Sequence, residues 1–521
     1  MMKRLSLILS IILTLVLVTA CGGTSEKTSK SESGGGAKKG GNLTFGLAGE
    51  PATMDPQIQN GTHGRTIKLA IYRGLLNYNK DGKLENELAK DYTVSEDQKT
   101  YTFNLRDAKF QNGDAVTAED VKYTFERIIK PDSKATFKTE LSIIQSIEVK
   151  DEKTISFTLK EPSAPFVHYL ALPESVIVSK KWVEEKGENA DPMGAGPFKF
   201  VSWTKGQDLV VEKFKNYYKP DQPKLDSIKF VFYPDENTRV NALRAGDVDL
   251  IETVPWKDAD SLAKTPGIKL DSVNGPFMQL QFNTKFKPFN DPKVRQAIAY
   301  AIDRKSIINT AFSGRGEAIY GMAIPKGYMG YSDKVNKYFK HDVEKAKQLL
   351  AEAGYPKGFK ARLLSTSQFS FHQQTAVAVQ AELKKIGIEV ELDLPDWATR
   401  INKNTEGDYD FVVAGTAGDI TDADWLSNFY NGGDVRLNNS AYFNDPEINQ
   451  LLIDGRKESD PAKREANYQK LIDRAMELSP FVYLSWREQS YGMKSNVEGF
   501  KNLEGFLSFQ SGVTLENVYL K

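Results

Sequence analysis

The stretch DPKVRQAIAYAIDRK, residues 291–305, carries the start signal of a helix. Asp291 can cap this helix, and Pro292 lies in the first turn, where proline is favoured because its missing N–H would have no helical partner. We expect the helix to run to about Ala311. Working outward from this stretch, helix and strand signals alternate along most of the chain.

Three further helices are predicted from their ends. Residues 117–120 form a capping-box pattern, Thr-Ala-Glu-Asp, which opens a helix through Ile129. An amphipathic segment at 342–353 is followed by Gly354, a residue that readily takes the left-handed conformation that stops a helix. Another helix is expected at 371–386, where Gly387 ends it.

Strands are expected between these helices. Segments that alternate in hydropathy or are short and apolar lie at 42–47, 99–105, 154–159, 388–394 and 409–414. Strands interleaved with helices indicate an α/β fold with some parallel sheet.

The first twenty residues have the composition of an export signal. Lys3 and Arg4 are followed by a nearly continuous apolar run at 5–18. Because about 20 apolar residues are needed to span a bilayer, the run fits the apolar region of a signal peptide better than a membrane helix. The segment 17–21 ends in the only cysteine and resembles the lipobox of bacterial lipoproteins, in which Cys21 is lipidated and becomes the mature N-terminus.

A tether is expected after Cys21. Residues 22–40 consist mainly of Gly, Ser, Thr, Lys and Glu without a large apolar residue, so they cannot bury enough surface to offset the entropy of ordering. A Gly-rich chain of this length places the folded part roughly 25 Å from the lipid on average. Folded structure should begin near Gly41. With no second cysteine, a disulfide framework is excluded.

The charge balance excludes some classes of partner. The chain has 69 basic and 69 acidic residues, and loss of Lys3 and Arg4 leaves a mature chain with a net charge of about −2. No basic stripe indicates nucleic-acid binding, and no further apolar run is long enough to cross a membrane. Residues 41–521 suffice for roughly two to four domain-sized units.

Short motifs along residues 41–521 stand in the order and spacing of one protein family. They are GNLT (41–44), GEPATMDP (49–56), IYRGLL (71–76), YTFNLR (101–106), FQNGD (110–114), TAEDVK (117–122), GAGPFKF (194–200), AGDVD (245–249), DPKVRQAI (291–298), AIDRK (301–305), KAK (345–347), LLAEAGY (349–355) and LKKIGI (383–388). In these motifs the chain resembles the bacterial extracellular solute-binding family 5, which includes oligopeptide- and dipeptide-binding lipoproteins of ABC transporters. Most motif residues are interpreted as scaffold, and Arg295, Asp303 and Arg304 are expected to form salt bridges.

The resemblance implies an α/β, two-lobed fold of the periplasmic-binding-protein kind (type II, class C), with an extra domain in the first lobe and a ligand cleft at the hinge. Two hinged lobes can close around a ligand. The expected divisions are a signal peptide at 1–20, the lipidated cysteine and tether at 21–40, lobe I at 41–81, 190–277 and 494–521, domain II at 82–189, and lobe III at 278–493.

The function that the resemblance implies is the capture of short peptides, from dipeptides to oligopeptides, for an ABC permease and ATPase complex. The protein would be a monomer, held by its lipid on the outer face of the cytoplasmic membrane. It would be a binding protein, with no enzymatic activity, no cofactor and no metal.

Candidate ligand contacts follow from the same resemblance. Residues 409–419 match the ligand-binding strand and turn of the family, so Gly415 and Ala417 are expected to offer backbone groups to an extended peptide. Asp419 is expected to pair with the ligand ammonium. Asp422 or Asp424 would take that role if the partner were shifted by a few residues. The alternative for all three is a solvated acidic loop or a helix cap.

Other candidates lie outside this strand. Many family members carry Trp after the glycine, where this chain has Thr416, and the change indicates a different or roomier pocket. Asn60 and Thr62 are expected to contact the ligand from the opposite lobe. Trp397 is expected either to line the cleft or to pack within its lobe.

Competing functions remain open at this stage. A hydrolase is disfavoured because the chain lacks a Gly-x-Ser-x-Gly, a His-Glu-x-x-His and a phosphate-binding Gly-x4-Gly-Lys-Ser/Thr motif. A nickel-chelate binder of the same fold is kept because His63 lies in the expected ligand-facing loop. Opines, sugars, glutathione and a purely signalling role are further alternatives.

Overall fold

The computed structural model describes residues 40–58, 61–187, 190–433 and 435–521. The chain divides into two units, residues 1–36 and 37–521, and the fold below is that of the second. The predictions for the signal peptide, for lipidation at Cys21, for most of the tether and for Asn60 lie outside the described residues. Among the described residues, no helix is both long and apolar enough to span a membrane.

A mixed sheet of eleven strands runs through the described residues. Its order is β15 (Glu389–Asp393), β14 (Lys360–Leu364), β16 (Phe411–Thr416), β12 (Ile268–Phe282), β17 (Phe481–Lys494), β11 (Leu250–Ile251), β1 (Asn42–Leu47), β10 (Ser227–Phe232), β9 (Asp208–Lys213) and β8 (Phe198–Thr204), with β13 (Gly316–Ala318) paired to β17. Strands β1, β10 and β11 are parallel, and so are β14, β15 and β16. The predicted α/β class is confirmed.

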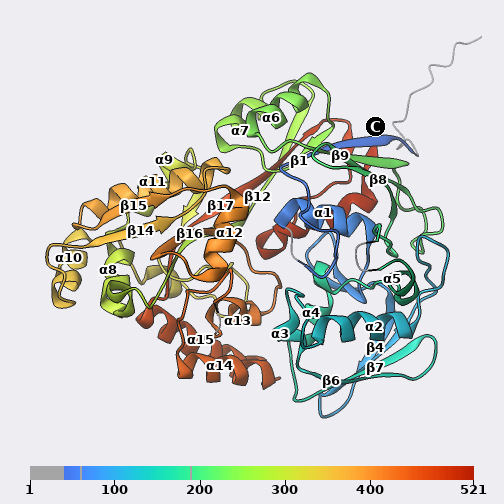
Figure 1. The fold of residues 1–521 in the computed structure, drawn as a ribbon, viewed down its shortest axis with the longest axis horizontal. Helices are drawn as coiled ribbons and strands as arrows, with labels where there is room; N and C mark the ends of the chain where they lie inside the picture. The colour runs from blue at the N-terminus through green and yellow to red at the C-terminus, as the bar shows by residue number, and fades with distance from the viewer. Residues whose placement is uncertain (1–39, 59–60, 188–189, 434) are drawn as a thin grey trace, which may run out of the picture. The chain divides into compact units, whose positions relative to one another are not determined.

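Two long strands join the two lobes. β12 pairs with β17 along most of its length, its end pairs with β16, and the end of β17 pairs with β11. In Figure 1, β12 and β17 lie between the blue-to-green elements of lobe I and the yellow-to-orange elements of lobe III. The β12–β17 register shifts between Asn274 and Phe277. At Gly275, between them, a Cβ atom would lie 2.0 Å from the Gly505 carbonyl oxygen, so this position requires glycine.

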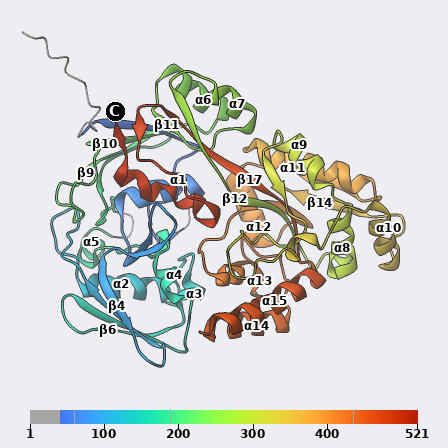
Figure 2. The same cartoon turned by 180° about the vertical axis from the view of Figure 1, so that it is seen from behind.

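Lobe I packs its sheet against helical segments. On β1, Leu43, Phe45 and Leu47 are fully buried because alternate side chains point to the same face. Next to this sheet lie α1 (Gly61–Ile71), α6 (Glu236–Ala245), α7 (Trp256–Ala263) and the 3-10 segment η5 (Gly505–Asn517). Figure 2 shows α1 and η5 side by side.

Domain II has its own four-stranded antiparallel sheet. The order is β4 (Ala89–Val94), β5 (Thr100–Leu105), β7 (Thr154–Leu159) and β6 (Ile144–Val149). One face packs on α2 (Ala118–Ile129), which opens with the predicted capping box between Thr117 and Asp120. Smaller elements are β2 (Leu76–Tyr78), β3 (Leu84–Asn86), α3 (Lys138–Leu141), α4 (Phe166–Leu170), η1 (Pro173–Ser175) and α5 (Lys180–Lys186).

Lobe III is rich in helices. They are α8 (Pro292–Ala301), α9 (Arg304–Ala311), α10 (Val343–Glu352), α11 (Ser370–Lys384), α12 (Trp397–Glu406), α13 (Ser427–Tyr430), α14 (Pro446–Lys457) and α15 (Pro461–Leu478), with η2 (Lys287–Asn290), η3 (Val335–Lys337) and η4 (Ala423–Leu426) between them. The short strands β18 (Val497–Glu498) and β19 (Tyr519–Leu520) pair near the C-terminus.

The prediction of a single helix from 291 to 311 is wrong. The segment forms α8 and α9, because Ile302 is extended and Asp303 caps a new helix by accepting from the N–H groups of Lys305 and Ser306. The other predicted helices and strands are confirmed, with ends that shift by at most two residues.

The predicted salt bridges of the motif arginines are also wrong. Arg295 donates to the carbonyl oxygens of Phe289, Leu478 and Ser479. Arg304 donates to the carbonyl oxygens of Tyr483 and Ala299. Both side chains serve the scaffold, but they do so by satisfying buried backbone acceptors, which would otherwise be left without partners.

Candidate functional site

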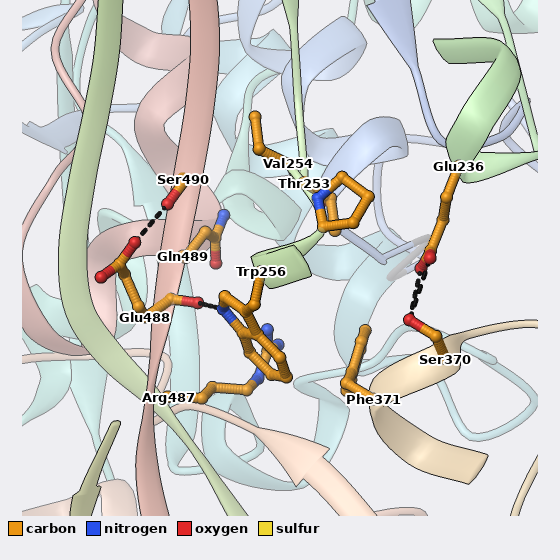
Figure 3. A pocket seen from close by; sticks show the side chains of 11 residues that line it. Glu236, Thr253, Val254, Trp256, Ser370, Phe371, Arg487, Glu488, Gln489 and Ser490 are labelled. Carbon is orange, nitrogen blue, oxygen red and sulfur yellow. Dashed lines mark hydrogen bonds between the residues drawn. The ribbon is translucent and has the colours of Figure 1, made fainter. Parts of the chain in front are cut away.

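A pocket lies at the hinge and takes residues from both lobes. Lobe I contributes Glu236 and the segment 253–256, strand β17 contributes residues 487–490, and the start of α11 contributes Ser370 and Phe371. Figure 3 shows the Ser370 hydroxyl hydrogen-bonded to the Glu236 carboxylate across the pocket, at 2.9 Å for the closer oxygen. This bond joins α11 of lobe III to α6 of lobe I.

Arg487 is a buried cation at this pocket. Its residue exposure is 6%, and its Nε has no hydrogen-bond partner. Its guanidinium carbon lies 4.7 Å from the ring centre of Phe371 and 5.7 Å from that of Phe509. Among the described residues, no carboxylate forms an ion pair with it, and the adjacent Glu488 pairs with Arg315, at 2.6 Å. Burial lowers the pKa of Arg487 to about 10.

Arg400 is a second buried cation of the same kind. It donates to the Val413 carbonyl oxygen at 3.1 Å and lies over the Trp397 ring at 5.1 Å. No carboxylate of the described segments pairs with it, and burial lowers its pKa to about 10. Both guanidinium groups act on His372, whose pKa is well below its usual value because of burial and then of Arg400 and Arg487. Two guanidinium groups therefore act on His372, and among the described residues no carboxylate forms an ion pair with either of them, although Glu236 and Glu488 also line the pocket.

Asp419 lies in a buried cluster that contacts η5. Its carboxylate accepts from Arg65 of α1 at 2.8 Å, and its backbone oxygen accepts from Gln510. Arg65 also donates twice to Glu174, at 3.1 Å each, and Lys68 donates to Glu174 at 3.1 Å. Burial raises the pKa of Asp419, and Arg65 opposes that rise. The ammonium-binding role of Asp419 stays a prediction, and its carboxylate already has a counter-ion from the opposite lobe.

Asp422 and Asp424 are held by other arginines. Asp422 accepts from both terminal nitrogens of Arg464, at 2.6 and 2.7 Å, and caps η4. Asp424 is fully buried, and it accepts from Arg456 at 2.9 Å and from the Tyr169 hydroxyl at 2.7 Å. Their helix-cap and ion-pair contacts favour a scaffold role for both, in line with the alternative drawn from the sequence.

Gly415, Thr416 and Ala417 occupy the end of β16 and the residue after it. On one side β16 pairs with β12 as far as Thr416, but on the other side its pairing with β14 ends at Val412. Beyond Val412 this outer edge has no strand partner among the described residues. A Cβ atom at Gly415 would lie 2.8 Å from Met278 Sδ and 3.2 Å from His372 Nε2. The Val413 carbonyl oxygen already accepts from Arg400, so strand addition by a ligand, which stays a prediction, has the backbone groups from Ala414 onward.

The remaining predicted residues lie near these groups. Trp397 is half-buried at the start of α12 and packs on Phe369 and His372, with ring centres 5.2 and 5.6 Å apart. Thr62 is half-buried in the first turn of α1, one turn before Arg65. The pKa of His63 is lowered to about 4 by burial and then by Arg239. Within the described segments, no group of three or more His, Cys, Asp or Glu side chains could hold a metal ion.

Sequence reasoning missed Arg487, Arg400 and His372. None of them lies in a recognisable motif, and only the fold brings β17, α12 and α11 together. Arginine is seldom fully buried unless it is paired. The local signal that pointed to Arg487 was its place directly after the largely apolar run at 481–486.

A family model covers most of the chain. Residues 83–436 match the model described as "Bacterial extracellular solute-binding proteins, family 5 Middle". The glutathione-binding protein GsiB of Escherichia coli (strain K12) is 31% identical over 461 residues, which cover 86% of this chain and 89% of that protein.

Solved structures share the fold. The PBP AgaA from A. tumefaciens R10, in complex with agropinic acid, is 59% identical with a TM-score of 0.89, over 92% of this chain and 99% of that one. DppA from Helicobacter pylori, in complex with the peptide STSA, is 29% identical with a TM-score of 0.84, over 92% of this chain and 98% of that one. AppA from Bacillus subtilis, in complex with a nonapeptide, is 25% identical with a TM-score of 0.84, over 93% of this chain and 100% of that one.

Proposed function

Because the chain belongs to the extracellular solute-binding proteins of family 5, which serve ABC importers, we propose that it captures a small solute through the solute's carboxylate. The family and the fold are those of substrate-binding proteins rather than enzymes. Capture takes place outside the cytoplasm, and the loaded protein delivers the solute to the importer.

The observation that carries this proposal is the buried, unpaired guanidinium of Arg487. An unpaired charge away from water is costly, and removal of one partner of a buried pair typically costs about 3–5 kcal/mol. A ligand carboxylate would supply the missing partner, and Arg can hold it by two parallel hydrogen bonds. Arg400, close to the same histidine, adds to the attraction for an anion.

Two kinds of carboxylate ligand have support. The relative at 59% identity binds agropinic acid, which makes that acid the first compound to test. A short peptide, the ligand expected from the sequence, carries a carboxylate at its C-terminus and could pair along the open edge of β16. The GsiB relative is named for glutathione, which also carries carboxylates.

The test compares ligands that differ in one group. Mass spectrometry under native conditions identifies any co-purified solute, and calorimetry then measures agropinic acid, glutathione, and Ala-Ala-Ala as the free acid and as the C-terminal amide. Arg487→Met should lower the affinity for the free acids by roughly 30-fold or more, since about 2–5 kcal/mol is the usual loss when one partner of a buried charge pair is removed.

Arg244→Met is the control, because Arg244 is an exposed residue of α6 that pairs with Asp258 at 3.6 Å and does not line the pocket. It should leave the affinity for acids within about threefold of the wild type, since the effects of surface ion pairs are small. If Arg487→Met binds the acids as tightly as the wild type does, Arg487 is not the carboxylate site.

We also propose that Cys21 is lipidated and that the protein is a monomer anchored to the outer face of the cytoplasmic membrane. The lipobox-like segment before Cys21 supports the anchor. Cys21→Ala should move the protein from the membrane fraction to the soluble extracytoplasmic fraction. A variant that remains equally membrane-bound would refute the anchor.

A further inference from the structure

The Arg65–Asp419 ion pair spans the two lobes. Arg65 lies on α1 of lobe I, and Asp419 follows β16 of lobe III. The two side chains are 2.8 Å apart, and their residue exposures are 1% and 7%. Burial removes the pair from solvent screening, so their attraction is stronger than that of a surface pair.

Charges in this cluster balance without a ligand. Arg65 and Lys68 supply two positive charges, and Glu174 and Asp419 supply two negative charges. Lys68 donates to Glu174 and to the Ile58 carbonyl oxygen. A ligand ammonium at Asp419 would add a third positive charge to this buried cluster, and the further carboxylate that acts on Lys68, Asp55, is already paired with Arg127.

A guanidinium from the chain also has an advantage over an ammonium from a ligand. It is always charged, and it reaches Asp419 and Glu174 from one rigid fork. Arg65 brings no translational cost, whereas a ligand group must offset the freedom that it loses on binding. A ligand amine would therefore have to displace a better-placed competitor.

We propose that Arg65 is a specificity-determining residue that takes the place of a ligand ammonium at Asp419. This role of Arg65 rests on the proposed function, because it concerns the same bound carboxylate ligand. The protein selects carboxylate ligands in which the α-nitrogen is uncharged, for example because it is acylated. Ligands that have no nitrogen at this position are accepted as well. Closure of the lobes uses the Arg65–Asp419 pair, so such ligands need no amine to close the site.

The experiment uses Ala-Ala-Ala and N-acetyl-Ala-Ala-Ala, which differ in the α-ammonium, with calorimetry on the purified mature protein. Arg65→Met leaves Asp419 without its counter-ion, so the free peptide should bind at least about tenfold more tightly than it binds the wild type. The ratio of free to acetylated affinity should rise by a similar factor. The double variant Arg65→Met with Asp419→Asn should lose this gain.

Arg464→Met is the matched control, because it removes another buried Arg–Asp pair of the same loop, at Asp422. It should leave the ratio of free to acetylated peptide as in the wild type. If folded Arg65→Met binds the free peptide no better than the wild type does, the proposal is overturned, whatever the wild-type affinity.

If Arg65→Met does not fold, the single substitution Asp419→Asn still tests the proposal. Asp419→Asn in the wild type should change the affinities for free and acetylated peptide equally, because Asp419 does not contact the ligand. A selective loss for the free peptide would overturn the proposal. Failure of the carboxylate role is seen separately, as an unchanged ratio of acid to C-terminal amide in Arg487→Met.

Discussion

Glu252 lies fully buried just after β11. One carboxylate oxygen accepts from the Ala48 N–H at 2.8 Å, and the other oxygen has no partner among the described residues. Burial raises the pKa of Glu252 to about 7, with only partial compensation from Ala48 and Arg239. The folded protein therefore holds this proton more tightly than the unfolded chain does.

The sign of the pH dependence follows from that pKa. Stability is fully present below the ordinary pKa of 4.5 and is lost as the pH rises through about 7, because ionised Glu252 is favoured only in the unfolded chain. At 1.36 kcal/mol per pKa unit, the loss is on the order of 3 kcal/mol. Denaturant unfolding at pH 5 and pH 8 measures it. In the Glu252→Gln variant, the fall in the free energy of unfolding from pH 5 to pH 8 should be smaller than in the wild type by about this amount. An equal fall in both proteins would contradict the raised pKa of Glu252.

The buried charges show where residue-level prediction ends. The sequence led us to expect Asp419 in a ligand loop, but its counter-ion Arg65, and Glu174 that also binds Arg65, come from distant segments. No periodicity or motif pairs residues so far apart in the chain. Arg487 and Arg400 were missed for the same reason, because the lack of a partner is a property of the folded structure.

At the scale of elements, local signals predicted most of the secondary structure. β1 and β7 were predicted with the bounds that they have, and α2 begins at its capping box. These elements carry their start signals within a few residues, so no distant contact is needed to place them.

The break between α8 and α9 shows a limit of periodicity. Asp303 precedes Arg304 as an N-cap, and Asp is a favoured residue at that position. The helical pattern continues through it, however, so periodicity alone joins the two helices. The acceptors of Arg304 include Tyr483 and Phe339, and no local signal could have named them.

At the scale of the whole folded unit, the two lobes are joined by more than the hinge strands. Tyr169 of domain II and Arg456 of lobe III both contact Asp424. The Ala164 N–H donates to the Arg456 carbonyl oxygen at 2.9 Å, and Lys457 pairs with Glu161 at 2.6 Å. These contacts bridge domain II and lobe III, so a movement of lobe III away from domain II would break them.

Tyr169→Phe removes one of these bridging bonds without changing the volume of the side chain. The Tyr169 hydroxyl donates to the buried Asp424 carboxylate at 2.7 Å, and a hydrogen bond to a charged group contributes about 1.5–3 kcal/mol. Because opening of the lobes to release a ligand would have to break this bond, its loss should speed ligand dissociation by roughly tenfold or more, with little change in association. Stopped-flow measurement of ligand release gives both rates.

Tyr101→Phe is the control for that measurement. Its hydroxyl also donates within the buried interior, but to the Ser163 carbonyl oxygen of the same domain, at 3.3 Å. It should lower the free energy of unfolding slightly, by about 1 kcal/mol, and leave the dissociation rate unchanged. If the two variants release ligand equally fast, closure does not depend on the Tyr169–Asp424 bond, and the remaining bridges at Arg456 and Lys457 must hold the lobes together.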